Sequence, residues 1–249
     1  MTQTRVVSFT PVVGARPADE IQSQIRALLF AQKLKAGDRL PSERALSEQF
    51  AVSRNSVRQA LRSLLDAGLL EMKKGAAGGA FIRDGGGEAV ATGLSDLYSL
   101  GTIRPEHLTE ARVLVAVEVV RLACARATDA EIDALAANIA AAAEAAKHRR
   151  YAERTEINLE FYRMLGRMTR NPILVTVTDA VTAITRKYVE EVGRTSNSSV
   201  MPFRARFLEA FRARDCDKAA ALMRAHLLNL QDIYLSGPPP IRATPRSPS

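Results

Sequence analysis

The chain has 249 residues, 47% of them hydrophobic, which is enough apolar surface to bury the cores of one or two domains. The sequence has no run of 18 uncharged apolar residues, and the apolar stretch near the N-terminus is short and interrupted by Ser8, Thr10 and Pro11. A transmembrane helix is therefore excluded and a signal peptide is not expected, which predicts a cytoplasmic protein. With only two cysteines, Cys124 and Cys216, a disulfide framework is also excluded.

The net charge of +8 is concentrated in the first third of the chain. Residues 1–83 hold 13 Lys and Arg against 7 Asp and Glu, whereas residues 84–249 hold 22 against 20. A compact basic N-terminal module suggests a polyanionic partner, although charge alone is a weak signal because many basic proteins bind no nucleic acid.

Three helices and a hairpin are predicted in this basic region. Residues 18–31 have an amphipathic apolar spacing, and Ser42 is a plausible N-cap for a second helix. After a tight connection, Ser53 is expected to cap a third helix over residues 54–67, which Gly68 ends. The runs LLEMKK and AFIR around the turn GAAGG predict a β-hairpin.

The predicted third helix has one buried stripe and one basic face. The stripe consists of apolar residues at helical spacing, Val57, Ala60, Leu61, Leu64 and Leu65. The other side presents polar and basic residues that can hydrogen-bond base edges in a major groove, Arg54, Asn55, Arg58, Gln59 and Arg62. Ser53 and Ser56 at the helix start suit a phosphate, and the hairpin tip could reach an adjacent groove. The alternative interpretation is a solvated basic helix face.

The remainder of the chain is predicted to be helical. We expect helices near 89–100, 105–127, 129–147, 150–169, 172–193, 202–213 and 215–235. The expected organisation is a flexible arm over 1–17, a winged helix-turn-helix domain over 18–84, an all-α effector-binding and dimerisation domain over 85–236, and a disordered Pro-rich tail over 237–249. The fold class is thus mainly α, with a C-terminal antiparallel helical bundle.

The segment LPSERALSEQFAVSRNSVRQALRSLLDAGLLEMKKGAAGGAFI strongly resembles the DNA-binding domain of the GntR family of bacterial regulators. The resemblance implies DNA contacts at the matching positions, which are Arg44, Ser53, Arg54, Asn55, Ser56, Arg58, Lys74 and Gly75. Ala51 departs from the family pattern, which has glycine before VSR. We expect only a small adjustment of the turn there.

The C-terminal half resembles the FCD effector domain of the FadR subgroup. The matching stretches are EARVLVAVEVVRLACARAT at 110–128, INLEFYRMLGRMTRNPIL at 157–174 and FLEAFRARDCDKAAALMRAHL at 207–227. Many FCD domains hold a divalent metal by one Asp and three His. Here Asn158, Tyr162 and Arg204 replace three of these ligands and only His226 is kept, so neither a metal nor another cofactor is expected.

The substituted cavity has two interpretations. In the first, Arg204 supplies the positive charge that the metal otherwise provides and binds a carboxylate or phosphate of an anionic effector, either an organic acid or an acyl-CoA. Arg112 could add a second hydrogen-bond donor. Hydrogen bonds that orient the effector could come from Asn158, Tyr162 and His226. In the second, these residues form a closed polar cluster without an effector. A homodimer on a palindromic operator is expected, and no catalytic arrangement supports an enzyme.

Overall fold

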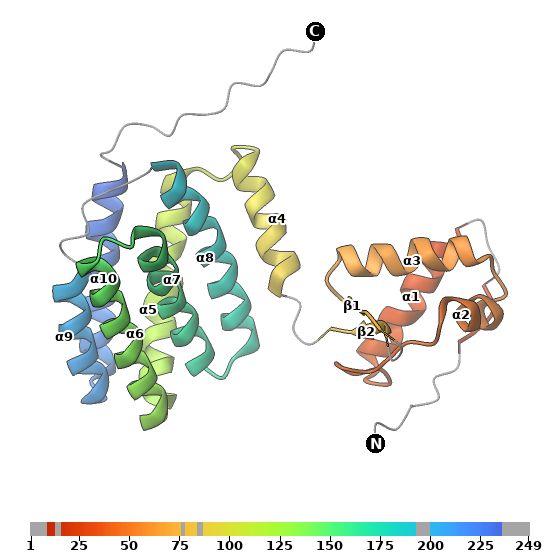
Figure 1. Cartoon of the computed structure of the whole chain (residues 1–249), viewed down its shortest axis with the longest axis horizontal. Coiled ribbons are helices and arrows are strands. Elements are labelled where there is room, and N and C mark those ends of the chain that lie inside the picture. Colours follow the sequence, from red (N-terminus) through yellow and green to blue (C-terminus); the bar gives the residue numbers. More distant parts are fainter. Residues whose placement is uncertain (1–8, 13–15, 76–77, 84–86, 193–199, 236–249) are drawn as a thin grey trace, which may run out of the picture. The chain divides into compact units, whose positions relative to one another are not determined.

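The computed structural model describes residues 9–12, 16–75, 78–83, 87–192 and 200–235. The chain divides into two compact units, Met1–Ala89 and Val90–Ser249 (Figure 1). Most of the expected N-terminal arm, part of the hairpin turn, most of the glycine linker and the Pro-rich tail lie outside the described residues.

The first unit consists of three helices and a two-stranded hairpin. Its elements are α1 (Pro17–Phe30), α2 (Glu43–Phe50), α3 (Arg54–Asp66), β1 (Leu70–Lys73) and β2 (Gly79–Ile82). The strands pair antiparallel, with Leu70 opposite Ile82. The core is formed by fully buried apolar residues from all three helices, including Ile21, Ile25, Leu46, Phe50, Val57 and Leu64.

Local capping signals set the ends of these helices as predicted. The Ser42 side chain accepts a hydrogen bond from the Ala45 backbone N–H at 3.2 Å, and Ser53 accepts one from Ser56 at 3.1 Å. Each hydroxyl satisfies one of the N–H groups that a helix start leaves without a partner. Gly68 adopts a left-handed φ of 70° and follows Ala67, the C-cap of α3, which confirms its predicted role in ending that helix.

Residues 9–12, within the segment expected to be a flexible arm, pack on the first unit. The Phe9 ring lies 4.6 Å from the Phe50 ring, and the Val12 N–H donates to the Phe50 carbonyl at 2.9 Å. Thr10 and Gln24 exchange two hydrogen bonds. The apolar Phe9 covers the end of α2, and this contact orders a short segment that the composition alone suggested to be free.

The second unit is entirely helical in its described part. Its helices are α5 (Pro105–Arg126), α6 (Asp129–Lys147), α7 (Tyr151–Met168), α8 (Pro172–Val192), α9 (Val200–Arg212) and α10 (Cys216–Leu235), preceded by α4 (Gly87–Ser99), which begins in the first unit. The predicted helices are all confirmed, with shifts of one or two residues at most boundaries. None of the described helices is long and apolar enough to cross a membrane.

Helix α5 is central to this bundle because it packs against α7, α8 and α10 (Figure 1). A chain of aromatic rings fills the core between α7 and α9, with Phe161 and Phe207 centroids 5.4 Å apart and Phe207 and Phe211 also 5.4 Å apart. Such rings bury large apolar areas, so this side of the bundle provides a rigid wall for the polar residues beside it.

Candidate functional site

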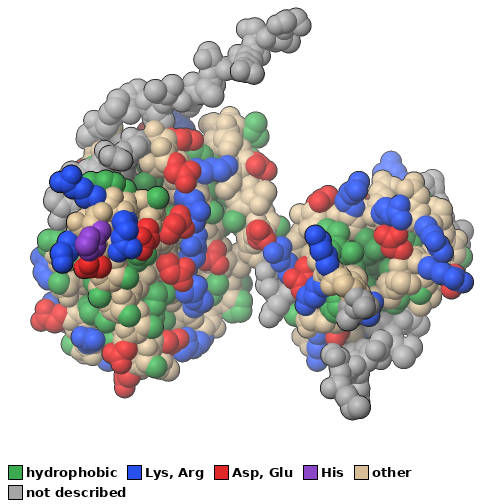
Figure 2. Space-filling model, viewed as in Figure 1, with side chains coloured by type: hydrophobic (Ala, Val, Ile, Leu, Met, Phe, Trp, Pro, Cys, Tyr) green, Lys and Arg blue, Asp and Glu red, His purple; other side chains and the backbone are tan. Residues whose placement is uncertain are grey.

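The exposed face of α3 carries the polar residues that were predicted to contact DNA. Val57, Ala60, Leu61 and Leu64 are buried, which confirms the predicted apolar stripe. Arg54, Asn55 and Arg58 are exposed, as are Gln59 and Arg62, which are not among the predicted DNA contacts. Lys and Arg side chains recur across the visible face of the first unit with some acidic side chains between them, and both kinds are also interspersed on the second unit (Figure 2). The burial of one side thus leaves a basic helix face open.

The start of α3 places two hydroxyl groups beside free backbone N–H groups. The Ser53 and Ser56 hydroxyl oxygens lie 2.9 Å apart, and both residues stand at the N-terminal turn of the helix. Backbone N–H groups and the helix dipole favour an anion at such a position. This arrangement suits a phosphate of a nucleic acid backbone.

Two of the predicted DNA-contact arginines are paired with carboxylates of α2. The Arg58 Nη2 lies 2.9 Å from Glu43 Oε2, and the Arg44 Nε lies 2.9 Å from Glu48 Oε1. The hydrogen bond and charge of Glu43 raise the pKa of Arg58. Glu43 was not singled out from the sequence, because it lies 15 residues before Arg58 and only the packing of α2 on α3 brings the two together.

The hairpin tip presents Lys74 and Gly75 to solvent. Gly75 has a φ of 104°, a conformation that favours glycine. The neighbouring Lys73 is engaged within the hairpin, since its Nζ lies 2.9 Å from a Glu71 carboxylate oxygen and 4.6 Å from the Phe81 ring centroid. Of the two lysines, Lys74 is therefore the one available to a ligand.

All five residues predicted to bind an effector line one cavity in the second unit. Its volume is about 460 Å³, part of it open to solvent. Four helices contribute the five side chains: Arg112 on α5, Asn158 and Tyr162 on α7, Arg204 on α9 and His226 on α10. The tertiary structure thus brings together positions that are up to 114 residues apart in sequence.

Arg204 is the most deeply buried of these side chains, with 1% of its surface exposed. Its guanidinium carbon lies over the Phe161 ring, 3.5 Å from the ring centroid, and the guanidinium donates to the amide oxygens of Asn158 at 3.2 Å and Asn138 at 3.4 Å. The buried Nε has no hydrogen-bond partner among the described residues. Burial, together with the charge of Arg112, lowers the pKa of Arg204 to about 10, so the group is still a cation at neutral pH.

Asn138 was missed in the sequence, since α6 carries no motif around it. It lies 66 residues before Arg204, and its own amide nitrogen donates to the Ile157 carbonyl at 3.1 Å. That second hydrogen bond fixes the Asn138 side chain with its oxygen toward Arg204. Asn138 therefore orients the guanidinium.

His226 is held neutral beside these cations. Its ring stacks on Phe203, with centroids 3.9 Å apart and planes 4° from parallel. Burial is the main cause that lowers the pKa of His226 to about 3, and the charges of Arg112 and Arg204 lower it further. A neutral imidazole can donate or accept one hydrogen bond in the cavity without adding to its charge.

The residues at the expected metal-ligand positions do not fit a divalent cation. Arg204 is a cation that repels a metal ion, and the side-chain oxygen of Asn158 already accepts a hydrogen bond from Arg204. Within the described part of the chain, no three His, Cys, Asp or Glu side chains are grouped so that they could hold a metal ion. The chemistry of this donor set favours an anion instead.

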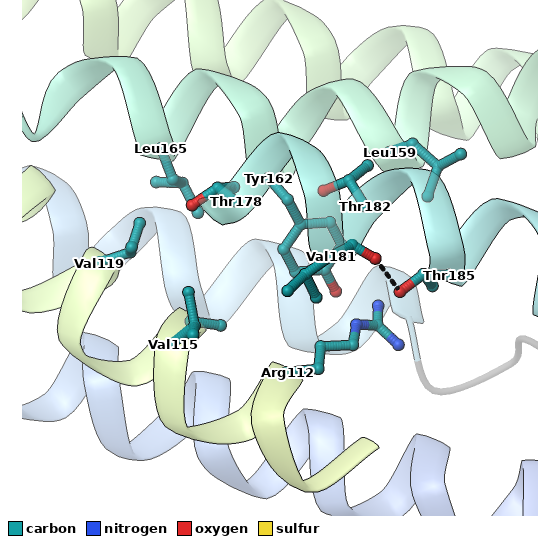
Figure 3. A pocket seen from close by; sticks show the side chains of 11 residues that line it. Arg112, Val115, Val119, Leu159, Tyr162, Leu165, Thr178, Val181, Thr182 and Thr185 are labelled. Carbon is teal, nitrogen blue, oxygen red and sulfur yellow. Dashed lines mark hydrogen bonds between the residues drawn. The ribbon is translucent and has the colours of Figure 1, made fainter. Parts of the chain in front are cut away.

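A second, more apolar compartment adjoins this polar cavity and shares Arg112, Tyr162, Leu159 and Thr185 with it (Figure 3). Its volume is about 400 Å³, again with part open to solvent. The remaining walls come from α5, α7 and α8 and consist of Val115, Ala116, Val119, Leu165, Thr178, Val181 and Thr182.

A basic helix on a three-helix unit with a hairpin, followed by a helical bundle with a buried cationic cavity, defines a winged helix-turn-helix transcription regulator with a ligand-binding domain. The family model described as bacterial regulatory proteins, gntR family, matches residues 17–82, and that of the FCD domain matches residues 107–229. The chain belongs to the GntR family, with an FCD domain after its DNA-binding domain.

Known relatives agree with this assignment. The chain is 29% identical to the HTH-type transcriptional regulator LutR of Bacillus subtilis, over 82% of this chain and 94% of that protein. It is 26% identical to the HTH-type transcriptional repressor NanR of Enterobacter sp., over 91% and 88% of the two chains. The fold is similar to that of Streptococcus agalactiae GntR, with a TM-score of 0.60 at 19% identity, covering 86% of this chain and 99% of that one. LutR and NanR are named as a transcriptional regulator and a transcriptional repressor, and the chain is a transcription regulator rather than an enzyme.

Proposed function

We propose that this protein is a homodimeric repressor of the FadR subgroup that binds a palindromic operator and releases it when a small anion enters the cavity around Arg204. DNA binding is assigned to residues 18–84, and effector binding and dimerisation to residues 85–236. The target is DNA, so the protein acts in the cytoplasm. No metal takes part.

The DNA contacts are proposed at Arg44, Ser53, Arg54, Asn55, Ser56, Arg58, Lys74 and Gly75. The exposed face of α3 supports base contacts by Arg54, Asn55 and Arg58, because arginine and asparagine can form paired hydrogen bonds with guanine and adenine. The two hydroxyls at the helix start support a phosphate contact there. A two-fold axis through the dimer would place two such helices in successive major grooves.

The anionic nature of the effector rests on one observation, the buried guanidinium of Arg204. Among the described residues its hydrogen bonds go to two neutral amide oxygens, and its Nε has no partner. A buried cation is costly unless a counter-charge is near, and a carboxylate or phosphate would provide both charge and hydrogen-bond acceptors. Arg112, which lines the same cavity with its guanidinium carbon 5.0 Å from the Tyr162 ring centroid, offers a second cation.

A second candidate is a regulator whose cavity is a closed polar cluster and does not respond to any effector. The hydrogen bonds from Arg204 to Asn138 and Asn158 favour it, since they satisfy part of the guanidinium internally. The buried Nε of Arg204, which has no hydrogen-bond partner among the described residues, weighs against it.

The test begins with selection of an operator from random DNA by the full-length protein, followed by a screen of organic and inorganic anions for release of that operator. At least one anion should weaken operator binding. Arg204→Met should abolish the response and keep operator affinity, whereas the control Arg206→Met, at an exposed position of the same helix, should keep both. A response that survives Arg204→Met would show that the effector binds at another site. If no anion weakened operator binding, the closed polar cluster would be favoured.

A further inference from the structure

The apolar compartment next to Arg204 narrows the chemistry of the effector, and this inference rests on the proposed function. The polar cavity and the apolar compartment share Arg112 and Tyr162 on their walls, so a ligand whose charged group contacts Arg204 can extend past these two residues. Beyond them, Val115, Val119, Leu165 and Val181 provide aliphatic walls (Figure 3). The space between these walls measures about 400 Å³ when its part open to solvent is included.

Charge is distributed unevenly between the two compartments. Of the residues that line the apolar compartment, only Arg112 carries a charge, and it stands at the junction with the polar cavity. A second carboxylate at the far end of a ligand would therefore be removed from water without a counter-charge, which is strongly unfavourable. The walls favour a ligand with one charged end and one apolar end.

One polar group stands out in the apolar compartment. Thr178 is 6% exposed, and its hydroxyl oxygen is buried without a hydrogen-bond partner in the described structure. Gly166 on α7 lies so close that a Cβ there would be 3.2 Å from the Thr178 Cβ, so the two helices hold this threonine in place. A buried hydroxyl without a partner is uncommon, and a ligand oxygen would satisfy it.

We propose that the effector is a monocarboxylate whose carboxylate binds Arg204 and whose tail, apolar except for one oxygen near Thr178, occupies the compartment between α5, α7 and α8. The carboxylate gives the guanidinium its counter-charge, and the tail removes apolar surface from water. A coenzyme A thioester of the same acid is disfavoured, because with its acyl chain in the compartment a neutral thioester carbonyl would stand where the carboxylate contacts Arg204.

The inference is tested by calorimetric titration of the full-length protein with acetate, butanoate, hexanoate and octanoate, and with adipate and suberate as length-matched dicarboxylates. Affinity should rise by about fourfold for each methylene group that enters the compartment. Each dicarboxylate should bind at least about tenfold more weakly than the monocarboxylate of equal length, because its second charge is desolvated. Binding of hexanoyl-coenzyme A tighter than hexanoate would overturn the inference.

Two variants locate the tail. Ala116→Leu should fill part of the compartment and weaken octanoate binding several-fold without changing acetate binding, whereas Ala111→Leu, at an exposed position of the same helix, should change neither. In the unchanged protein 7-oxooctanoate should bind more tightly than octanoate, and Thr178→Val should remove that preference. The chain-length series uses the unchanged protein, so it decides the matter even if a variant does not fold.

The outcomes separate this inference from the proposed function. If short carboxylates bind and Arg204→Met abolishes their binding, but affinity does not rise with chain length, the tail site is wrong and the anion site stands. If no carboxylate binds, or binding survives Arg204→Met, the carboxylate site proposed for Arg204 is wrong as well.

Discussion

Glu43 and Arg58 form a two-point contact between α2 and α3, with Arg58 Nη2 2.9 Å from Glu43 Oε2 and Arg58 Nε 3.4 Å from Glu43 Oε1. The carboxylate occupies the Nε and Nη2 edge of the guanidinium and does not engage Nη1. A paired arginine loses less conformational freedom when it binds a base, so we expect Glu43 to position Arg58 for its proposed contact with DNA.

Replacing Glu43 by Gln should reduce the discrimination between operator and random DNA several-fold. The amide cannot hold the guanidinium as firmly, and loss of one negative charge near the phosphates strengthens binding to any sequence. Because the ion pair is partly exposed, the free energy of unfolding should fall by less than about 1 kcal/mol. Affinities for both DNAs over a range of salt concentrations measure the effect. An unchanged ratio would contradict the positioning role, and Asp66→Asn, at the exposed end of α3, is the control.

Replacing Arg58 by Ala should weaken operator binding by about 1–3 kcal/mol and affect random DNA much less, because a base contact is lost rather than a phosphate contact. Competition binding with both DNAs measures this. An equal loss on both would identify Arg58 as a phosphate contact. Arg26→Ala, at an exposed position of α1 outside the proposed contact set, should leave the ratio unchanged.

Replacing Ala51 by Gly should stabilise the first unit by about 1 kcal/mol. Ala51 has φ 56° and ψ 41° at the end of α2, and this left-handed conformation strains a residue with a Cβ. Urea unfolding of the full-length protein measures the change. The control Ala67→Gly, at a position with φ −74° at the end of α3, should instead destabilise the protein. A destabilising effect of Ala51→Gly would show that the turn carries no such strain.

Stability should fall as the pH drops from about 6.5 toward 3, because of His226. Burial lowers the pKa of His226 in the folded protein to about 3 from an ordinary value of 6.5, so between these values the unfolded chain binds a proton that the folded protein does not. The slope is at most about 1.4 kcal/mol per pH unit for one group.

Urea unfolding between pH 7 and 5 measures this slope. Carboxylates such as Glu131, whose pKa is lowered to about 2 by hydrogen bonding to Arg170, affect the stability only at lower pH, where they take up protons. His226→Leu should flatten the profile, whereas His148→Asn, at an exposed position, should leave it as it is. An unchanged slope in His226→Leu would show that another group causes the pH dependence.

Local signals in the sequence predicted the helices and their ends. Ser42, Ser53 and Gly68 act on backbone groups within three to five residues, so their effect is visible in the sequence itself. The spacing of Val57, Leu61 and Leu64 likewise depends on the period of a single helix. The positions of Arg112, Asn158, Tyr162, Arg204 and His226 followed from the resemblance to the FCD domain.

Only the tertiary structure decided how those side chains are held. Asn138 and Phe161 contact Arg204 from α6 and α7, and Glu43 contacts Arg58 from α2, in each case because two helices pack together. The apolar compartment behind Tyr162 has no signal of its own, since its valines and threonines have the spacing of ordinary core residues. Whether such residues fill a core or line a space depends on how closely three helices approach one another, and a pattern along one helix does not contain that distance.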